Sequence, residues 1–433
     1  MKRDLLGCRL SHSVCLAAIL ALSATSVSAL PLLSQTTFGG AGDDVGTSVA
    51  ANGSSVYFFG GSDTAGAVVG QFSSSLGASP VWSRSWPGPI DGAFYGGALT
   101  STALIAVGVS DTQTVDTVGG KERKGITVRF NTDGSAGSGT GGAVWSRQTP
   151  GAPGGFPYGG IEWLNRVTTA SEGGNTRLYT VGIGERVGFT PEFGLFVTKL
   201  DDSGNILWSR NDFTPTNVNN TPSIVATDNG VYVASRNDTS GVHPYLKRYD
   251  QNGNLLWSRT SVALGEYLGV TSAGGNVYAV GQTNPQTANP DFLIESWDGA
   301  GNLLWSKIYD RNLTEDILNG VVFEGGRLFA VGSTKGGAAG GVDGVVLELD
   351  ALTGNLLDST LWGGTEDDLF NGLSVAGSTL YAVGSTRSFG AGGSDIAIAS
   401  FALNGSAVPE PTTLLLTSLG MVGLALARRQ VVG

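Results

Sequence analysis

The chain has 433 residues, of which 36 are acidic and 25 are basic, so its formal net charge is −11. Nucleic acids and anionic lipids are bound mainly through Lys and Arg, and an acidic protein is therefore a poor partner for either. Glycine is abundant, with 68 residues, and hydrophobic residues make up 41% of the chain, which is enough for a packed core. This composition favours many short strands joined by tight turns.

Residues 1–29 have the order of charge and hydropathy that is typical of a secretory signal peptide. Three basic residues precede an apolar run over residues 14–22, and small residues follow as far as Ala29. The run is shorter than the roughly 20 residues that a membrane-spanning helix needs. We predict cleavage by signal peptidase after Ala29, with a permanent N-terminal anchor as the alternative. Cys8 and Cys15 both lie in this segment, so the rest of the chain offers no thiol for a disulfide, a metal or a nucleophile.

A β-strand pattern recurs about every 50 residues from residue 56 onward, and six of its seven copies end in Gly. The copies begin at Val56, Leu104, Leu178, Val231, Val277, Leu328 and Leu380. Each copy follows a weaker strand and, except for the last, precedes an alternating strand, a turn and a further strand. That further strand carries Trp82, Trp145, Trp208, Trp257 and Trp305 in turn, with Asp358 at the matching position of the sixth copy. Repeats of this length indicate a solenoid, a propeller or an array.

Four strands in each of seven repeats predict an all-β fold over residues 30–405, a seven-bladed β-propeller of four-stranded antiparallel blades. The seventh repeat lacks its last strand, whereas residues 32–37 align with the last strand of the sixth. We expect residues 32–37 to pair with residues 396–401 and close the ring. The segments Gly39–Asp44 and Gly363–Asp368 resemble the bacterial seven-bladed β-propeller repeat. The recurring phrase Asp-x-x-Gly-Asn-Leu-Leu-Trp resembles the quinoprotein repeat, and both families stay open.

Residues 406–433 carry a Pro-Glu-Pro triplet, an apolar stretch from 412 to 427 and a basic pair. The residues concerned are Pro409, Glu410, Pro411, Arg428 and Arg429. Their order and spacing resemble the PEP-CTERM sorting signal of Gram-negative bacteria. The resemblance implies that an exosortase cuts near the triplet and passes the body to the cell surface or extracellular matrix, often in bacteria that make exopolysaccharide. The apolar stretch predicts a hydrophobic helix that contacts the inner membrane transiently, with the arginines on the cytoplasmic side; a simple tail anchor is the alternative.

Removal of residues 1–29 and 428–433 takes away five of the basic residues but one acidic residue, which leaves a net charge of −15. Many acidic residues lie on the connections that enter the first strand of each repeat. They are Asp43, Asp44, Asp91, Glu162, Glu266, Glu315, Asp316, Glu366, Asp367 and Asp368. These connections are expected to share one face, where carboxylates could surround a cation such as Ca²⁺. The alternative is a structural role, because Asp and Glu in turns accept backbone hydrogen bonds.

The remaining candidate residues favour a structural interpretation. The regular Trp series predicts packing between adjacent sheets rather than a stacking platform for sugars or a quinone. His243 has no companion nucleophile, and we expect it to be a solvated loop residue. No catalytic motif is present in the sequence.

We therefore expect a non-enzymatic scaffold that displays loops to polysaccharide, another protein or a cation. Two extended segments, 111–124 and 149–158, suit such display. The alternative is an enzyme, either a polysaccharide lyase or hydrolase that uses channel carboxylates or a quinoprotein-like dehydrogenase.

Overall fold

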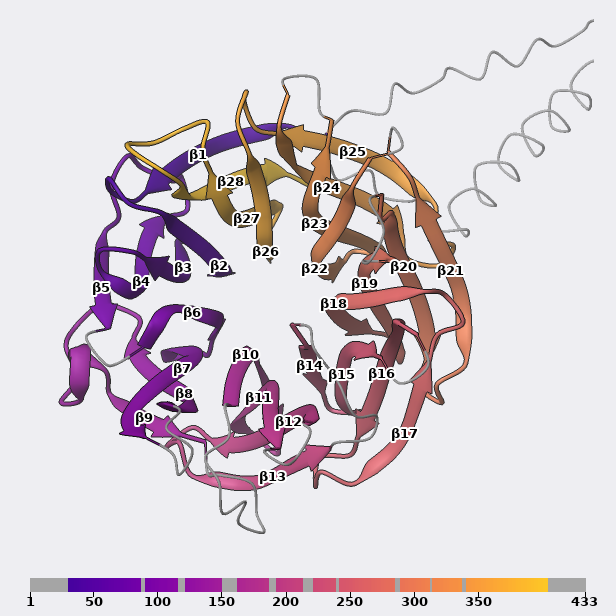
Figure 1. Ribbon diagram of the computed structural model, residues 1–433, viewed down its shortest axis with the longest axis horizontal. Helices are drawn as coiled ribbons and strands as arrows, with labels where there is room; N and C mark the ends of the chain where they lie inside the picture. Colours follow the sequence, from indigo (N-terminus) through magenta and orange to yellow (C-terminus); the bar gives the residue numbers. More distant parts are fainter. Residues whose placement is uncertain are drawn as a thin grey trace, which may run out of the picture.

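Short β-strands surround a central opening (Figure 1). The computed structural model describes residues 30–86, 90–115, 121–149, 162–186, 192–212, 221–238, 241–284, 289–311, 314–336 and 340–403. The predicted signal peptide and sorting segment lie outside these ranges. Within them the chain is all-β, and no helix has the length and apolar character needed to cross a membrane.

The strands follow one another in groups of four. The first two groups are β2 (Asp44–Ala51), β3 (Ser55–Ser62), β4 (Gly66–Ser73) and β5 (Trp82–Trp86), then β6 (Ile90–Leu99), β7 (Ala103–Val115), β8 (Lys121–Asn131) and β9 (Trp145–Gln148), with the short 3₁₀ turn η1 (Thr140–Gly142) before β9. The next two are β10 (Glu162–Glu172), β11 (Asn175–Arg186), β12 (Glu192–Asp201) and β13 (Ile206–Asp212), then β14 (Ser223–Thr227), β15 (Gly230–Asn237), β16 (His243–Tyr249) and β17 (Leu255–Thr260). The last three are β18 (Gly265–Ala273), β19 (Asn276–Thr283), β20 (Phe292–Asp298) and β21 (Leu303–Tyr309), then β22 (Asp316–Glu324), β23 (Arg327–Lys335), β24 (Val342–Asp350) and β25 (Leu356–Trp362), and finally β26 (Asp368–Ala376), β27 (Thr379–Thr386) and β28 (Asp395–Ala402) with β1 (Leu32–Phe38).

Strand pairing confirms the predicted antiparallel sheets. In the described chain there are five four-stranded sheets and one eight-stranded sheet. The eight-stranded sheet consists of β2–β5 and β6–β9, which are joined by the single residue pair Gly61–Ala93. The first strand of each group lies nearest the central opening and the fourth lies at the rim (Figure 1). The segment predicted as a loop at 111–124 instead extends β7 and β8 as a hairpin, at least as far as Val115 and from Lys121.

Strand β1 closes the ring, as the sequence predicts. It pairs with β28 from Leu32 opposite Phe401 to Phe38 opposite Ile396. It also contacts the sheets on both sides. Trp362 of β25 donates from Nε1 to Gln35 Oε1 at 2.7 Å. On the other side, Thr36 donates from Oγ1 to the Gly77 carbonyl at 3.1 Å.

The Trp series packs between adjacent sheets, and this prediction is confirmed. Trp208 of β13 donates from Nε1 to the Gln251 carbonyl, at 2.9 Å, in the turn between β16 and β17. Gly253 in that turn has φ +80°, and a Cβ there would lie 2.9 Å from Trp208 Cδ2. The same contact recurs between Gly301 and Trp257. Glycine is therefore required where each indole meets the next turn.

A buried ion pair joins two neighbouring sheets. Lys247 of β16 has a side chain that is 1% exposed, and it pairs with Asp212 at the end of β13. Burial lowers the pKa of Lys247, while Asp212 acts in the opposite direction. Asp212 therefore compensates for part of the hydration that the ammonium group loses on burial, and the Tyr245 ring, 5.2 Å from Nζ, lies beside it as well.

Candidate functional site

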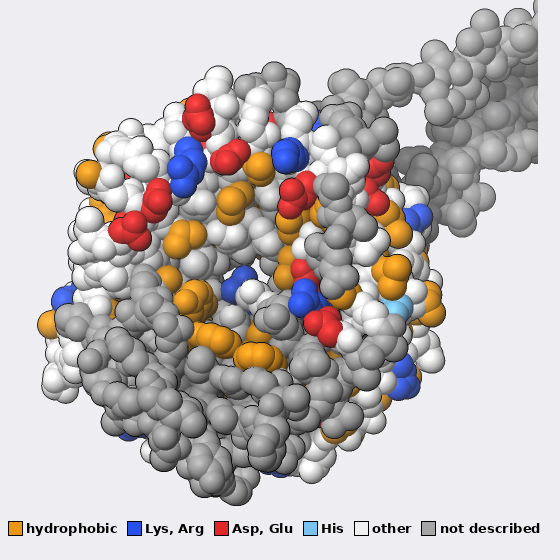
Figure 2. Space-filling view, in the orientation of Figure 1, with side chains coloured by type: hydrophobic (Ala, Val, Ile, Leu, Met, Phe, Trp, Pro, Cys, Tyr) orange, Lys and Arg blue, Asp and Glu red, His pale blue; other side chains and the backbone are white. Residues whose placement is uncertain are grey.

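Six of the strands nearest the axis contain a β-bulge. In each, the register against the second strand skips one residue, and a bulge aims the side chain of such a residue away from the regular ladder. The skipped residues are Thr47, Tyr95, Asn165, Leu268, Asn319 and Asn371. All six line one pocket of about 250 Å³, together with Arg166 and Thr221. We call it the central pocket, and Figure 2 shows the hollow at the centre of the molecule with a basic side chain inside it.

Side chains of the central pocket bind the backbone of the next strand around the ring. Asn319 donates from Nδ2 to the Phe370 carbonyl at 2.9 Å, and Asn371 donates in the same way to the Gly46 carbonyl at 2.9 Å. Thr47 continues the series by donating to the Phe94 carbonyl at 2.5 Å. Because a carbonyl can only accept, these bonds fix both amides with their Oδ1 atoms as the remaining acceptors.

Arg166 supplies the positive charge of the central pocket. Its Nη1 donates to the carbonyls of Tyr95, at 2.7 Å, and Asn165, at 3.0 Å. Burial lowers the pKa of Arg166 to about 10, so the guanidinium stays charged at neutral pH. No carboxylate of the described residues forms an ion pair with it. Beside it, Asn165 Oδ1 is buried and has no hydrogen-bond partner among the described residues.

Three of the predicted cation ligands are buried at the start of innermost strands. Asp44, Asp316 and Asp368 are 2%, 0% and 0% exposed. Each accepts a backbone N–H from the connection before it, at 2.9, 2.6 and 2.7 Å respectively. A threonine hydroxyl of the second strand also donates to Asp316 and to Asp368. These contacts support the structural interpretation of the acidic residues.

The buried carboxylates meet a second carboxylate from the preceding sheet. A Cβ added to Gly39 would lie 2.1 Å from Asp395 Oδ1 and 2.5 Å from Asp44 Oδ2. Gly363 occupies the matching place between Asp343 and Asp368. The absence of a side chain at Gly39 and Gly363 thus leaves the room in which each carboxylate pair fits.

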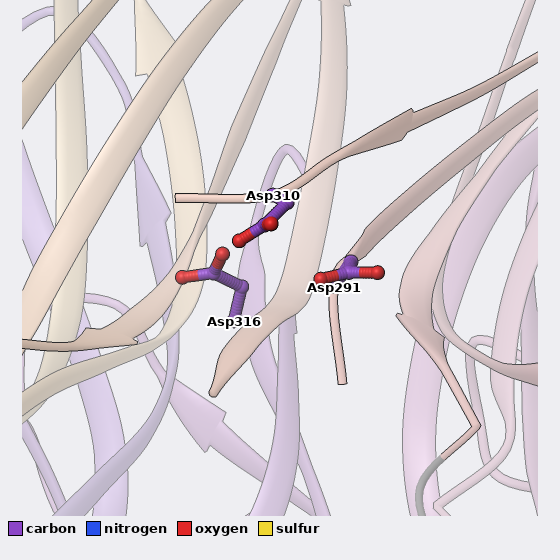
Figure 3. A group of neighbouring side chains, drawn as sticks. All are labelled: Asp291, Asp310 and Asp316. Carbon is purple, nitrogen blue, oxygen red and sulfur yellow. The ribbon is translucent and has the colours of Figure 1, made fainter. Parts of the chain in front are cut away.

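At the third such place the glycine is replaced by Asp310. Three carboxylates, those of Asp291, Asp310 and Asp316, therefore point toward one another (Figure 3). One oxygen from each lies within 4.8 Å of the others. Burial, with the charges of Asp310 and Asp291, raises the pKa of Asp316 to about 6, although hydrogen bonds from Thr334 and Arg311 oppose the shift.

The raised pKa of Asp316 predicts a pH-dependent stability. In the folded protein Asp316 keeps its proton up to about pH 6, whereas in the unfolded chain it releases the proton near pH 4. The free energy of unfolding therefore falls as the pH rises from about 4 to about 6. At neutral pH the cost is about 3 kcal/mol. We expect Asp316→Asn to raise the melting temperature at pH 7 and to leave it little changed at pH 4.

Asp298→Asn is the matched control for this measurement. Hydrogen bonds from Asn302 and Ala300 lower the pKa of Asp298, so its carboxylate stabilises the fold above the usual Asp pKa. This variant should lower the melting temperature at pH 7. If each substitution changed the melting temperature by the same amount at pH 4 as at pH 7, the raised pKa of Asp316 would be contradicted.

The other predicted acidic residues are dispersed. Asp43 is exposed and pairs with Arg387, whereas Glu266 is buried and pairs with Arg236. The remaining predicted residues with described side chains are Glu315, Glu366 and Asp367. None of these three belongs to a group of carboxylates that could hold a metal ion. The side chains of Asp91 and Glu162 lie outside the described part, as do Ala29 and the sorting residues. Ca²⁺ binding by these acidic residues stays a prediction.

His243 differs from its predicted place in a loop. It is the first residue of β16, is half-buried, and its Nδ1 lies 2.8 Å from the Ala263 carbonyl. The strand begins here because the chain pairs with β15 through Asn237 opposite His243.

The residues of the central pocket were not predicted from the sequence. A signal for two of them is present, because Asn precedes Gly at the start of the weaker strand in Asn319–Gly320 and again in Asn371–Gly372. A bulge depends on the register against the neighbouring strand, which the pattern of a single strand does not reveal.

Residues 407–429 match the family model of the PEP-CTERM protein-sorting motif. The chain carries a PEP-CTERM sorting motif. The resemblance seen in the sequence is thereby confirmed, and the motif implies an exported protein that is processed by an exosortase and reaches the cell envelope or surface. No curated protein has a sequence that matches this chain.

Solved structures with similar folds include three proteins of different kinds. The polysaccharide lyase Uly1 is 10% identical with a TM-score of 0.50, and the match covers 83% of this chain and 90% of that one. The WD40 domain of Toxoplasma gondii coronin is 12% identical with a TM-score of 0.46, covering 88% and 90%. A subtype N11 neuraminidase-like protein of A/flat-faced bat/Peru/033/2010 (H18N11) is 12% identical with a TM-score of 0.32, covering 55% and 87%. At these identities the likeness concerns the propeller-like fold alone.

Proposed function

We propose that this PEP-CTERM protein is a seven-bladed propeller that acts at the cell surface or in the extracellular matrix as a non-enzymatic binding scaffold. The body is residues 30–405, preceded by a signal peptide that is removed after Ala29 and followed by the sorting segment 406–433. Signal peptidase and exosortase process the chain, and the hydrophobic helix of the sorting segment contacts the membrane until the cut. Exopolysaccharide is the proposed partner.

The observation that carries the proposal is the central pocket. Its walls come from the innermost strands, and two of its amides and one of its hydroxyls, those of Asn319, Asn371 and Thr47, are held by hydrogen bonds around the ring. A pocket that is largely preformed, with a few fixed polar groups, is typical of small-molecule sites. Rigid walls also reduce the entropy lost on binding.

The chemistry of the lining favours binding over hydrolysis. Glycoside hydrolysis generally uses two carboxylates about 5 to 10 Å apart. The residues that line the central pocket in the described chain offer amides, hydroxyls, one guanidinium and one leucine, and none of them is Asp or Glu. Among the described lining residues, a ligand held by these groups therefore meets no carboxylate acid or base.

A panel of soluble saccharides tests the proposed function. We expect the purified protein to bind at least one saccharide of the panel in isothermal titration calorimetry and to leave that saccharide intact after prolonged incubation. Shortening of the saccharide, followed by chromatography, would favour an enzyme. Absence of binding across the panel would contradict the scaffold proposal.

A further inference from the structure

We propose that the central pocket recognises a carboxylate on a hydroxylated ligand, such as a uronic acid unit at the end of an acidic saccharide. This inference rests on the proposed function and specifies its ligand. It follows from three properties of the pocket: an arginine without an acidic partner, a set of hydrogen-bond acceptors and a limited volume.

The guanidinium of Arg166 is anchored through one of its three nitrogen atoms. Both of its hydrogen bonds to described residues are donated by Nη1, to the carbonyls of Tyr95 and Asn165. Five N–H groups are available on a guanidinium, and their planar arrangement matches a carboxylate through two parallel hydrogen bonds. The contacts with the backbone therefore position Arg166 while Nε and Nη2 can serve a ligand.

The charge of Arg166 is not compensated within the described pocket. The other lining side chains are neutral. A charge that is partly removed from water interacts more strongly with an opposite charge than a surface charge does. The body as a whole is acidic, so general attraction of anions by the protein surface does not account for binding at this place.

The acceptors distinguish a hydroxylated acid from a simple inorganic anion. Asn319 and Asn371 each use Nδ2 for the backbone, which leaves Oδ1 to accept a hydrogen bond. Asn165 Oδ1 is buried and finds no donor in the part of the chain that the structure describes, and such an atom costs free energy until a donor reaches it. Sugar hydroxyls supply these donors, whereas sulfate has none to give.

The volume limits the ligand to a small group. At about 250 Å³ the pocket is slightly smaller than the roughly 300–1,000 Å³ that is usual for small-molecule sites. One sugar unit fits this space, and a folded chain segment does not. The pocket therefore suits the end of a saccharide.

The experiment compares three probes on the full chain by isothermal titration calorimetry: D-glucuronate, D-glucose and inorganic sulfate. We expect glucuronate to bind at least tenfold more tightly than either of the others. Glucose shares the hydroxyls without the charge, and sulfate has the charge without the hydroxyls. If glucose bound as tightly as glucuronate, the proposed recognition of the carboxylate would be overturned. If sulfate bound as tightly as glucuronate, the proposed role of the ligand hydroxyls would be overturned.

Variants then identify the residue responsible. Arg166→Gln should weaken glucuronate binding at least tenfold and bring it to the level of glucose, while Arg166→Lys should retain part of the preference. Arg147→Gln in the rim strand β9, where the arginine stacks on Trp145, is the matched control and should leave binding unchanged. Thermal melting verifies that each variant is folded. If a variant does not fold, the comparison of the three probes on the unaltered protein still tests the proposal.

The two proposals fail in different ways. Binding of neutral saccharides that is unaffected by Arg166→Gln would overturn the carboxylate site and leave the scaffold function standing. Absence of binding for every saccharide, the acidic ones included, would overturn both.

Discussion

Gly39→Ala should be strongly destabilising, by about 3 kcal/mol in the free energy of unfolding, since overfilling a packed interior costs about 1–3 kcal/mol and here disturbs two buried charges. The new methyl group would lie 2.1 Å from Asp395 Oδ1 and 2.5 Å from Asp44 Oδ2. Asp395 and Asp44 are both 2% exposed, so neither has space to retreat. Urea denaturation of the purified variant measures the effect.

Gly40→Ala is the matched control, because it alters the next residue of the same connection. A Cβ at Gly40 has no atom within 4 Å, so this substitution should change stability by less than about 0.5 kcal/mol. Similar losses for the two variants would mean that the connection as a whole resists alanine. The carboxylate pair would then have no special role there.

Asp212→Ala should cost about 3–5 kcal/mol, because it removes the carboxylate that pairs with the buried ammonium of Lys247. Asp212 itself is one-fifth exposed, whereas Lys247 is 1% exposed, so the penalty falls on the lysine. The double variant Asp212→Ala, Lys247→Met should recover much of the loss, since it removes the buried charge while keeping an apolar chain of similar length. Denaturation curves of the three proteins give the comparison.

The surface ion pair between Asp43 and Arg387 provides the control for this prediction. Both side chains are more than half exposed, and exposed pairs contribute about 0–1 kcal/mol. Arg387→Ala should therefore have a small effect, and it leaves in place the hydrogen bond that Asp43 Oδ1 accepts from the Ser394 N–H. If Asp212→Ala were equally mild, water would have to hydrate Lys247, and the sheets around it would be less tightly packed than described.

The repeat pattern was sufficient to predict the sheets because it reports on burial. Apolar residues at alternate positions identify strands, and the alignment of residues 32–37 with the last strand of the sixth repeat correctly placed β1 beside β28. The Trp series was likewise assigned to packing, because an indole that recurs at one position in successive sheets meets the same neighbour each time.

The candidate site was harder to predict for a physical reason. The central pocket is built from residues that leave the regular ladder, such as Asn319 and Thr47, and a bulge is a property of two strands together. Arg166 gave no signal in the sequence because nothing nearby in the chain marks it. The acidic residues were conspicuous in the sequence, yet Asp44 and Asp368 are occupied by backbone and side-chain hydrogen bonds.

The pairing of β1 with β28 also governs when the protein can finish folding. Leu32 is made and exported among the first residues of the body, but its partner Phe401 is among the last. Until that partner arrives, the edge of β28 and the early strand both lack their hydrogen bonds, and the closing contact spans nearly the entire body, which makes it slow to form. Completion of the ring therefore has to wait for the last sheet, which immediately precedes the sorting motif at residues 407–429 in the chain.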